Sequence, residues 1–293
     1  MARIGILHPG QMGVSIAASA IVAGNEEWVG AGRSADTVER AESVGLRDVG
    51  SVEALASEAE LIVSVAPPAA ALDVARSVAA TEFAGLFLDA NAVSPATATQ
   101  VGDVVESGDA MAVDGGIIGP PAWHVGSTRL YVAGAPAAAV AELLNGGPLE
   151  VVALDTPYGS ASALKMAYAG WSKGSAALLL AMAAYAEDSG VSDALADEWE
   201  RSQPGLVERA ASTAAGTAPK AWRFVGEMEE IAATMGDSAL PAGFHAAAAV
   251  VYERMAGFKD ASSPATLNDV TAALLNPKLR VGSDPSALVA RGL

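Results

Sequence analysis

The sequence has no cysteine and only three histidines among its 293 residues. The absence of cysteine excludes disulfide bonds, cysteine-ligated iron–sulfur clusters and a thiol nucleophile. The histidines, His8, His124 and His245, are scattered along the chain and lack the close ligand spacing of a zinc motif. We therefore predict no metal site.

Basic residues are also scarce: 17 Lys and Arg stand against 34 Asp and Glu, which gives a formal net charge of −17. No stretch clusters Lys and Arg, so nucleic acid and anionic membranes are poor partners for this chain. The longest apolar run, residues 177–186, is about half of the roughly 20 residues that span a bilayer. The N-terminus enters a predicted strand directly, without room for a signal peptide. We expect a cytoplasmic protein with a small-molecule substrate and no membrane span.

Hydrophobic residues make up 52% of the chain, and in its first half short β-like runs alternate with helical ones. The predicted strands are 3–7, 27–32, 61–66, 86–89, 112–116, 129–133 and 150–153. The predicted helices between them are 11–23, 35–43, 52–57, 69–79, 95–107 and 136–144. This alternation predicts an α/β Rossmann-type doubly wound sheet with helices on both faces, over a first domain of residues 1–156.

From Gly159 onward the sequence indicates helices only, which predicts an all-α second domain of residues 157–293. The first of these helices runs from Ser160 to about Asp188 and is mostly apolar around its circumference. Such a helix must be enclosed by protein, either its own domain or a second subunit.

A glycine-marked turn, His8-Pro9-Gly10-Gln11-Met12-Gly13, lies between the first predicted strand and helix. In this setting Gly10 lets a pyrophosphate approach the backbone, Gly13 lets the helix pack closely on the strand, and the helix N-terminus attracts the anion. His8 occupies the position of the usual first glycine, so the turn must differ in detail. The motif predicts a dinucleotide site.

The end of the second predicted strand carries Gly32-Arg33-Ser34 where an NAD-binding protein has an acidic residue for the ribose hydroxyl. A guanidinium and a hydroxyl suit a 2′-phosphate, so we predict NADP(H) as the cofactor. The predicted cofactor contacts are Pro9, Gly10, Gln11, Met12, Gly13, Arg33, Ser34, Ala66, Pro67 and Asn91.

Lys165 stands in the first turns of the long apolar helix, flanked by Leu164 and Met166. A lysine there must extend to solvent, pair with an acceptor, or lose its proton, and desolvation favours proton transfer near neutral pH. Tyr168 and Lys173 share roughly one helical face with it. Both are candidate substrate contacts, and each is equally compatible with a packing or solvated side chain. His245 is a candidate polar contact or a buried core residue.

Four segments of the chain, in order and at suitable intervals, resemble the β-hydroxyacid dehydrogenase family, which includes 6-phosphogluconate and 3-hydroxyisobutyrate dehydrogenases and the related imine reductases. The four segments are residues 9–13 (Pro-Gly-Gln-Met-Gly), 88–95 (Leu-Asp-Ala-Asn-Ala-Val-Ser-Pro), 114–128 (Asp-Gly-Gly-Ile-Ile-Gly-Pro through Gly-Ser-Thr) and 159–165 (Gly-Ser-Ala-Ser-Ala-Leu-Lys). The resemblance implies an NAD(P) domain followed by an all-α domain, a catalytic role for Lys165, and a homodimer formed through the long helix starting near Ser160.

The sequence departs from this family where substrate is bound. The family's Ser-Gly-Gly is here Ile118-Gly119-Pro120, so the hydroxyl that would bind a substrate carboxylate is missing, and the family's asparagine after the lysine is Ala169. Ile118 and Gly119 remain the predicted substrate segment. The sequence thus predicts an NADP(H)-dependent oxidoreductase of a small hydroxy or oxo compound, with Lys165 as general acid/base. Imine reduction and a non-catalytic NADP-binding protein are the alternatives.

Overall fold

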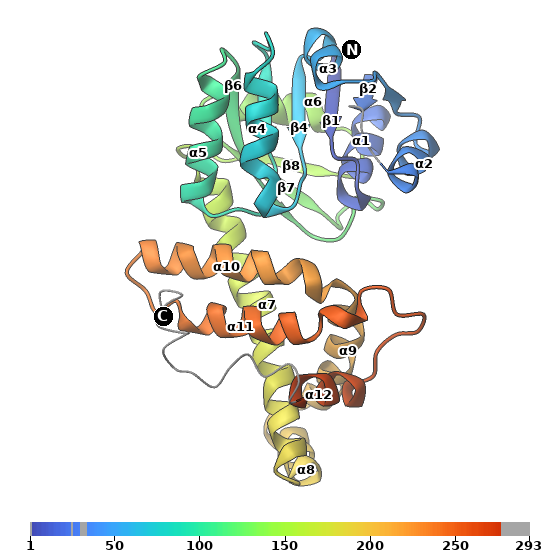
Figure 1. The fold of residues 1–293 in the computed structure, drawn as a ribbon, viewed down its shortest axis with the longest axis vertical. Coiled ribbons are helices and arrows are strands. Elements are labelled where there is room, and N and C mark those ends of the chain that lie inside the picture. Colours follow the sequence, from blue (N-terminus) through green and yellow to red (C-terminus); the bar gives the residue numbers. More distant parts are fainter. Residues whose placement is uncertain (1, 25, 30–33, 277–293) are drawn as a thin grey trace. The chain divides into compact units, whose positions relative to one another are not determined.

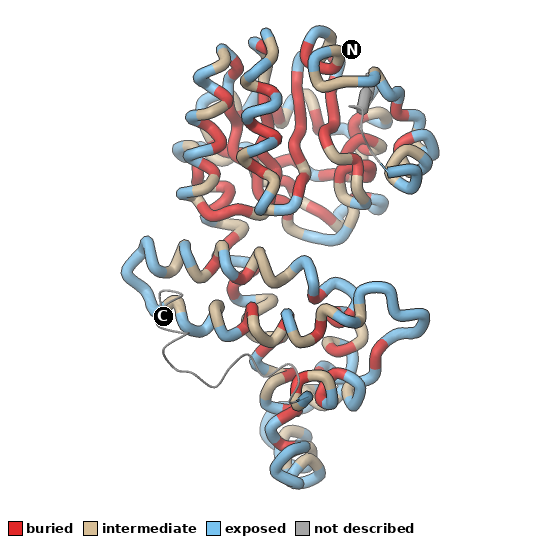
Figure 2. Tube along the Cα trace, viewed as in Figure 1, coloured by how far each residue is buried: buried red, intermediate tan, exposed pale blue. Residues whose placement is uncertain are grey.

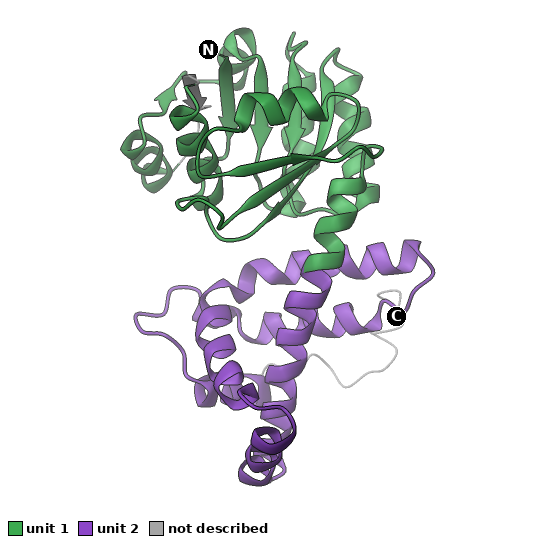
Figure 3. Cartoon of the chain, turned by 180° about the vertical axis from the view of Figure 1, so that it is seen from behind, with its two compact units in different colours: residues 1–168 green, residues 169–293 purple. Residues whose placement is uncertain are grey.

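The structure is a computed structural model that describes residues 2–24, 26–29 and 34–276. The chain forms two compact units, residues 1–168 and 169–293 (Figure 3), and each is described by itself. The division falls inside helix α7 (Ser160–Asp188), later than the domain boundary expected after residue 156. The first turns of α7 belong to the first unit because their backbone is hydrogen-bonded to one of its strands.

Within the described residues, the first unit contains one sheet of eight strands in the order β3-β2-β1-β4-β5-β6-β7-β8. The strands are β1 (Arg3–Leu7), β2 (Glu26–Val29), β3 (Arg47–Asp48), β4 (Leu61–Ser64), β5 (Leu86–Asp89), β6 (Met111–Ile118), β7 (Arg129–Ala133) and β8 (Glu150–Ala153). The first six in sequence are parallel, whereas β7 runs antiparallel to β6 and β8 runs parallel to β7. The mostly parallel sheet is as predicted.

Helices cover both faces of this sheet. They are α1 (Gln11–Val22), α2 (Ala35–Ser43), α3 (Val52–Glu58), the 3₁₀ turn η1 (Pro68–Ala70), α4 (Ala71–Ala79), α5 (Pro95–Glu106) and α6 (Ala137–Leu144). Apolar residues of α1, α2 and α6 pack in one buried cluster, and those of α3, α4 and α5 pack in another. Figure 1 labels these helices, and Figure 2 shows the central strands between them as largely buried. Neighbouring residues of β4 alternate between the clusters, as a sheet buried on both faces requires. The doubly wound fold class is confirmed.

The second unit is helical in its described part. It combines the C-terminal portion of α7 with α8 (Ser192–Ser202), α9 (Leu206–Thr217), η2 (Ala218–Lys220), α10 (Ala221–Asp237), α11 (Gly243–Arg254), η3 (Ala256–Phe258) and α12 (Leu267–Leu275). Helices α10 and α11 pack together, and Met228, Ile231 and Tyr252 are fully buried there. No helix in residues 2–24, 26–29 and 34–276 is long and apolar enough to cross a membrane.

The strand order creates the position where a ligand would bind. From β1 the chain winds outward through β2 and β3, then returns to the other side of β1 with β4 and continues to β5 and β6. The loops that follow β1 and β4 therefore diverge, and in open parallel sheets of this kind ligands bind at that crevice outside the carboxyl ends of the strands. The predicted glycine turn directly follows β1.

Candidate cofactor and proton-transfer site

The turn after β1 is tight, and its first residue has an unusual backbone. His8 has a φ of +62°, in the left-handed region that glycine normally occupies, and the amide of Gly10 donates to the carbonyl of His8 over 2.7 Å. A non-glycine residue in that region costs on the order of 1 kcal/mol or more. His8 therefore differs from the usual glycine in its side chain, whereas its backbone adopts the left-handed conformation that suits glycine.

The N-terminus of α1 has an open approach. Gly10 is its N-cap without a side-chain hydrogen bond, and the first turn contains no acidic residue. Among the described residues, a Cβ on Gly10 would meet only the carbonyl oxygen of His8 at 4.0 Å, whereas a Cβ on Gly13 would lie 3.0 Å from the same oxygen. Gly13 therefore serves packing and Gly10 leaves space. The amides at the start of a helix have no partner within the helix, and together they favour an anion.

Asn91 fixes the loop on the other side of the crevice. Its Oδ1 accepts the amide of Ala66 at 2.5 Å, and its Nδ2 donates to the hydroxyl of Ser64 at 3.2 Å. Asn91 is buried, and through these bonds it ties the segment after β5 to the segment after β4 that holds Ala66 and Pro67. Its observed contacts are thus structural, and its hydrogen bond to a cofactor stays a prediction.

The start of α2 combines two hydroxyls with a guanidinium. Ser34 Oγ lies 3.0 Å from Thr37 Oγ1, and Nη2 of Arg40 donates to Thr37 Oγ1 over 3.0 Å. Among the described residues, the buried Nε of Arg40 has no hydrogen-bond partner. Arg33, the predicted phosphate ligand, lies outside the described residues. Thr37 and Arg40 were not predicted, although they follow Ser34 at successive three-residue intervals, which brings neighbouring members of the set together on the helix surface.

Lys165 lies against strand β6. Its Nζ donates to the carbonyl of Ile117 over 2.8 Å, and the side chain is half-buried. Ile118 and Gly119 directly follow that carbonyl, so the structure brings the predicted lysine and the predicted substrate segment together. Tyr168, three residues further along α7, is 51% exposed.

Lys173 and His245 lie in the second unit. The ammonium of Lys173 forms an ion pair with Glu227 and lies 4.3 Å from the centre of the Phe224 ring. His245 Nε2 lies 3.3 Å from the carbonyl oxygen of Gly170. The charge of Lys173 is already balanced inside the protein, which favours its structural role over contact with a substrate anion.

Two carboxylates that the sequence did not predict are buried in the sheet, and one of them contacts the helix that carries Lys165. Asp89 and Asp114 are paired in register on β5 and β6. Asp114 Oδ2 accepts the amides of Ala161 at 2.7 Å and Ser162 at 3.0 Å, and its Oδ1 accepts the Ser162 hydroxyl at 2.5 Å. Burial raises the pKa of Asp114 above its usual range, although these bonds oppose the shift. The sequence signal that could have identified Asp114 is an acidic residue within an otherwise apolar strand.

Asp89 has fewer partners. Its Oδ1 accepts the amide of Asn91 at 3.1 Å, and its Oδ2 is buried without a hydrogen-bond partner among the described residues. Burial raises the pKa of Asp89 to about 7, and the charge of Asp114 adds to the shift. Burial and the two carboxylates also raise the pKa of the nearby Tyr158.

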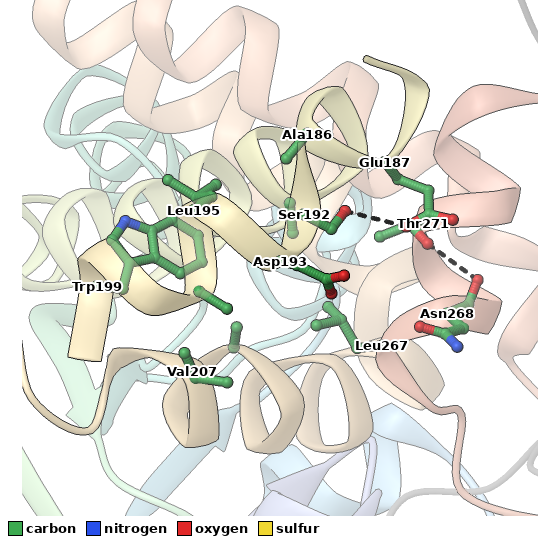
Figure 4. A pocket seen from close by; sticks show the side chains of 13 residues that line it. Ala186, Glu187, Ser192, Asp193, Leu195, Trp199, Val207, Leu267, Asn268 and Thr271 are labelled. Atoms are coloured by element: carbon green, nitrogen blue, oxygen red, sulfur yellow. Dashed lines mark hydrogen bonds between the residues drawn. The ribbon is translucent and has the colours of Figure 1, made fainter. Parts of the chain in front are cut away.

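The second unit contains a separate cavity of about 180 Å³ between α7, α8, α9 and α12 (Figure 4). Apolar side chains such as Leu195, Trp199 and Val207 line it, together with the carboxylates of Glu187 and Asp193. No residue of the predicted site lines this cavity. Across the described part of the chain, no three His, Asp or Glu side chains gather in a way that could hold a metal ion.

The buried Asp89 predicts a pH dependence of stability. Its folded-state pKa, about 7, lies above its ordinary value of 3.8, so the folded protein holds this proton more tightly and loses stability as the pH rises between those values. Asp89→Asn keeps the acceptor for Asn91 and removes the titration. Relative to wild type, the variant should gain on the order of a few kcal/mol at pH 8 and much less at pH 4.

Urea unfolding at both pH values measures this difference. The matched control is Asp103→Asn, which removes an exposed carboxylate from α5. An advantage of Asp89→Asn that is the same at pH 4 and pH 8 would show that the buried carboxyl does not titrate as described.

Comparisons with known proteins identify similar sequences and folds. A family model described as a domain of unknown function (DUF1932) matches residues 186–255, and no curated protein sequence matches the chain. A conserved hypothetical protein from Sinorhizobium meliloti is 26% identical, with a TM-score of 0.66 over 94% of this chain and 96% of that chain.

Two further solved structures belong to enzymes. The 3-hydroxyisobutyrate dehydrogenase of Mycobacterium tuberculosis, solved with L-serine, is 18% identical, with a TM-score of 0.67 over 94% of this chain and 98% of that one. The reductive aminase of Aspergillus terreus, in complex with NADPH and ethyl levulinate, is 18% identical, with a TM-score of 0.56 over 94% and 98%. The predicted resemblance is confirmed for the fold: the chain has the Rossmann-type domain and following helical region of hydroxyacid dehydrogenases and imine reductases.

Proposed function

We propose that this protein is an NADP(H)-dependent oxidoreductase that transfers hydride to or from a small hydroxy or oxo compound. The observation that carries the proposal is the open N-terminus of α1, which lies beside the crevice between β1 and β4. The similar structures support it, because they include a dehydrogenase and a reductive aminase in complex with NADPH.

The residues at this crevice fit a dinucleotide. The amides of Gln11, Met12 and Gly13 would hold the pyrophosphate, and the missing side chain of Gly10 leaves space for it. The segment of Ala66 and Pro67, fixed by Asn91, would form the opposite wall. When bound, the nicotinamide supplies the hydride donor or acceptor, which this chain's own side chains lack.

Lys165 would transfer the proton that accompanies the hydride. In carbonyl reduction its Nζ donates a proton to the substrate oxygen, and in alcohol oxidation the neutral amine removes it. The carbonyl of Ile117, 2.8 Å from Nζ, holds the group at the end of β6.

Reduction of an imine is the second candidate, and Ile118 favours it. An isoleucine at this position offers no hydroxyl to a substrate carboxylate, which weakens the case for a simple 3-hydroxy acid. The likeness to the reductive aminase, whose structure holds ethyl levulinate, agrees with a substrate that is not a free acid.

The preference for NADP(H) rests on the start of α2. Arg33 would bind the 2′-phosphate, and Ser34, Thr37 and Arg40 form a hydroxyl and guanidinium cluster directly after it. Within the part of the chain that the structure describes, the buried Nε of Arg40 has no hydrogen-bond partner, which would suit an anion at this end of α2.

The homodimer is part of the same proposal. Along α7, Trp171, Leu178, Met182 and Tyr185 are 75%, 56%, 43% and 65% exposed. Their spacing of seven, four and three residues places them on one stripe of the helix, as in a helix–helix seam. A second copy of the chain, packed on this stripe, would remove the exposed apolar surface from water.

Replacing Lys165 tests the proton-transfer role. Lys165→Met keeps the length of the side chain and removes the ammonium. We expect kcat for reduction of aldehydes and ketoacids to fall by about 100-fold or more, the usual contribution of general acid catalysis. NADPH oxidation, followed by absorbance against panels of aldehydes, ketoacids and cyclic imines, measures the effect.

Lys220→Met is the control, because Lys220 is exposed in the second unit. Turnover that survives only with preformed imines would favour the second candidate. Unchanged turnover of carbonyl substrates would remove the assignment of Lys165.

Replacing Arg33 tests the choice of cofactor. Arg33→Ala should weaken NADPH binding by about 1–3 kcal/mol, the value of charge-assisted hydrogen bonds, and leave NADH binding unchanged. Titration of both cofactors against tryptophan fluorescence measures the two affinities. Equal affinity of the wild-type protein for NADPH and NADH would contradict the preference.

A further inference from the structure

The first turns of α7 are tied to strand β6 at two points. At the start of the helix, the carboxylate of Asp114 accepts the amides of Ala161 and Ser162 and the Ser162 hydroxyl, at 2.7, 3.0 and 2.5 Å. One turn later, Nζ of Lys165 reaches back to the carbonyl of Ile117. The two acceptors are three residues apart on the same strand, so the strand determines where the lysine lies.

Gly116 lies between these two points and makes the close approach possible. A Cβ at this position would lie 2.5 Å from the carbonyl oxygen of Ala161 and 3.2 Å from Cβ of Lys165. The helix therefore rests directly on the strand backbone. Close packing of this kind limits the distance between helix and strand, but it does not fix how the helix is rotated or shifted along the strand.

The bonds to Asp114 supply that missing constraint. Asp114 is fully buried, so water does not replace its partners, and a carboxylate at a helix N-terminus interacts favourably with the aligned backbone dipoles. Its oxygens accept from two successive amides and one hydroxyl, which specifies both rotation and position of the first turn. Asp89, equally buried on the neighbouring strand, accepts the amide of Asn91 and makes no described hydrogen bond to α7.

We propose that Asp114 is a positioning residue for Lys165: by capping α7 from strand β6 it holds the ammonium at the carbonyl of Ile117. The proposal rests on the proposed function for its catalytic consequence. Its structural content, the placement of Lys165 Nζ, does not depend on that function and has its own measurement.

That measurement is the rate at which Lys165 of the intact, full-length protein reacts with acetic anhydride, read by mass spectrometry of the peptides after digestion. Asp114→Ala should release the ammonium from its acceptor and raise the labelling rate of Lys165 about fivefold or more. Asp114→Asn keeps one acceptor oxygen and should restore part of the protection. Lys173 and Lys220 of the second unit serve as internal references and should keep their wild-type rates.

Asp89→Asn is the matched control, because it alters an equally buried carboxyl that does not cap α7. Ser162→Ala removes only the hydroxyl bond and gives a second, milder test if Asp114→Ala does not fold; it should raise Lys165 labelling about twofold. Unchanged labelling of Lys165 in folded Asp114→Ala, or in Ser162→Ala when Asp114→Ala is unfolded, would overturn the proposal. An equal increase in Asp89→Asn would do so as well, because it would point to general loosening.

Kinetics give the second readout. With a substrate that the wild type turns over, Asp114→Ala should lower kcat about tenfold and leave the Kd for NADPH unchanged, with partial rescue by Asp114→Asn. A loss that appears only as weaker NADPH binding would overturn the positioning role. If labelling responds to Asp114 but Lys165→Met retains full turnover, the positioning of Lys165 stands and the proposed catalytic function fails.

Discussion

The first backbone amides of a helix have no acceptor within the helix, so they need partners from elsewhere. In the first unit, the N-termini of α7 and α1 differ in whether a side chain supplies such a partner. At α7 a buried carboxylate from the neighbouring strand, Asp114, accepts two amides and a hydroxyl. At α1 the N-cap is Gly10, without a side-chain cap and without an acidic residue in the first turn. Lys165 lies one turn after the capped end of α7, and we propose that the uncapped end of α1 offers its backbone amides to an anion.

This contrast between the two helix ends explains the positions of three glycines. Gly13 and Gly116 allow a helix to approach a strand so closely that a Cβ would touch backbone carbonyls. At Gly10, by contrast, the nearest atom that a Cβ would meet within the described part of the chain is the His8 carbonyl oxygen at 4.0 Å. The same residue type thus serves packing in two places, and in a third it leaves the space that we propose for a ligand. The proposed chemistry follows from the difference: an anionic cofactor at one helix end, and a proton carried by Lys165 near the other.

Much of the first unit could be predicted from its sequence, because apolar runs buried on both faces produce a strong signal. Strands β1, β5, β7 and β8 have the predicted bounds, and β6 is longer than predicted. Strand β3 was missed because its two residues, Arg47 and Asp48, are exposed and carry no hydrophobic pattern. The predicted end of the second strand, with Arg33, lies outside the described residues.

The site was predictable only in part. The turn after β1 and the lysine of α7 follow from local motifs, whereas the partners of Lys165 and Lys173 depend on contacts between distant segments that no local pattern encodes. Asp114 is an example. The sequence shows an acidic residue inside an apolar strand, but the proposed role of Asp114 depends on its contact with Ala161 of α7, which lies 47 residues further along the chain. Glu227, the partner of Lys173, likewise could not be identified from the local sequence.

The central claim is that a dinucleotide binds at the open N-terminus of α1. The most direct test is titration of NADPH into the wild-type protein and Gly10→Asp, followed by tryptophan fluorescence with thermal unfolding as a check on the fold. The new carboxylate would occupy the free space, cap the helix and repel the pyrophosphate. We expect Gly10→Asp to lose NADPH affinity by about 100-fold or more with the fold intact. Equal affinity of the two proteins would contradict it.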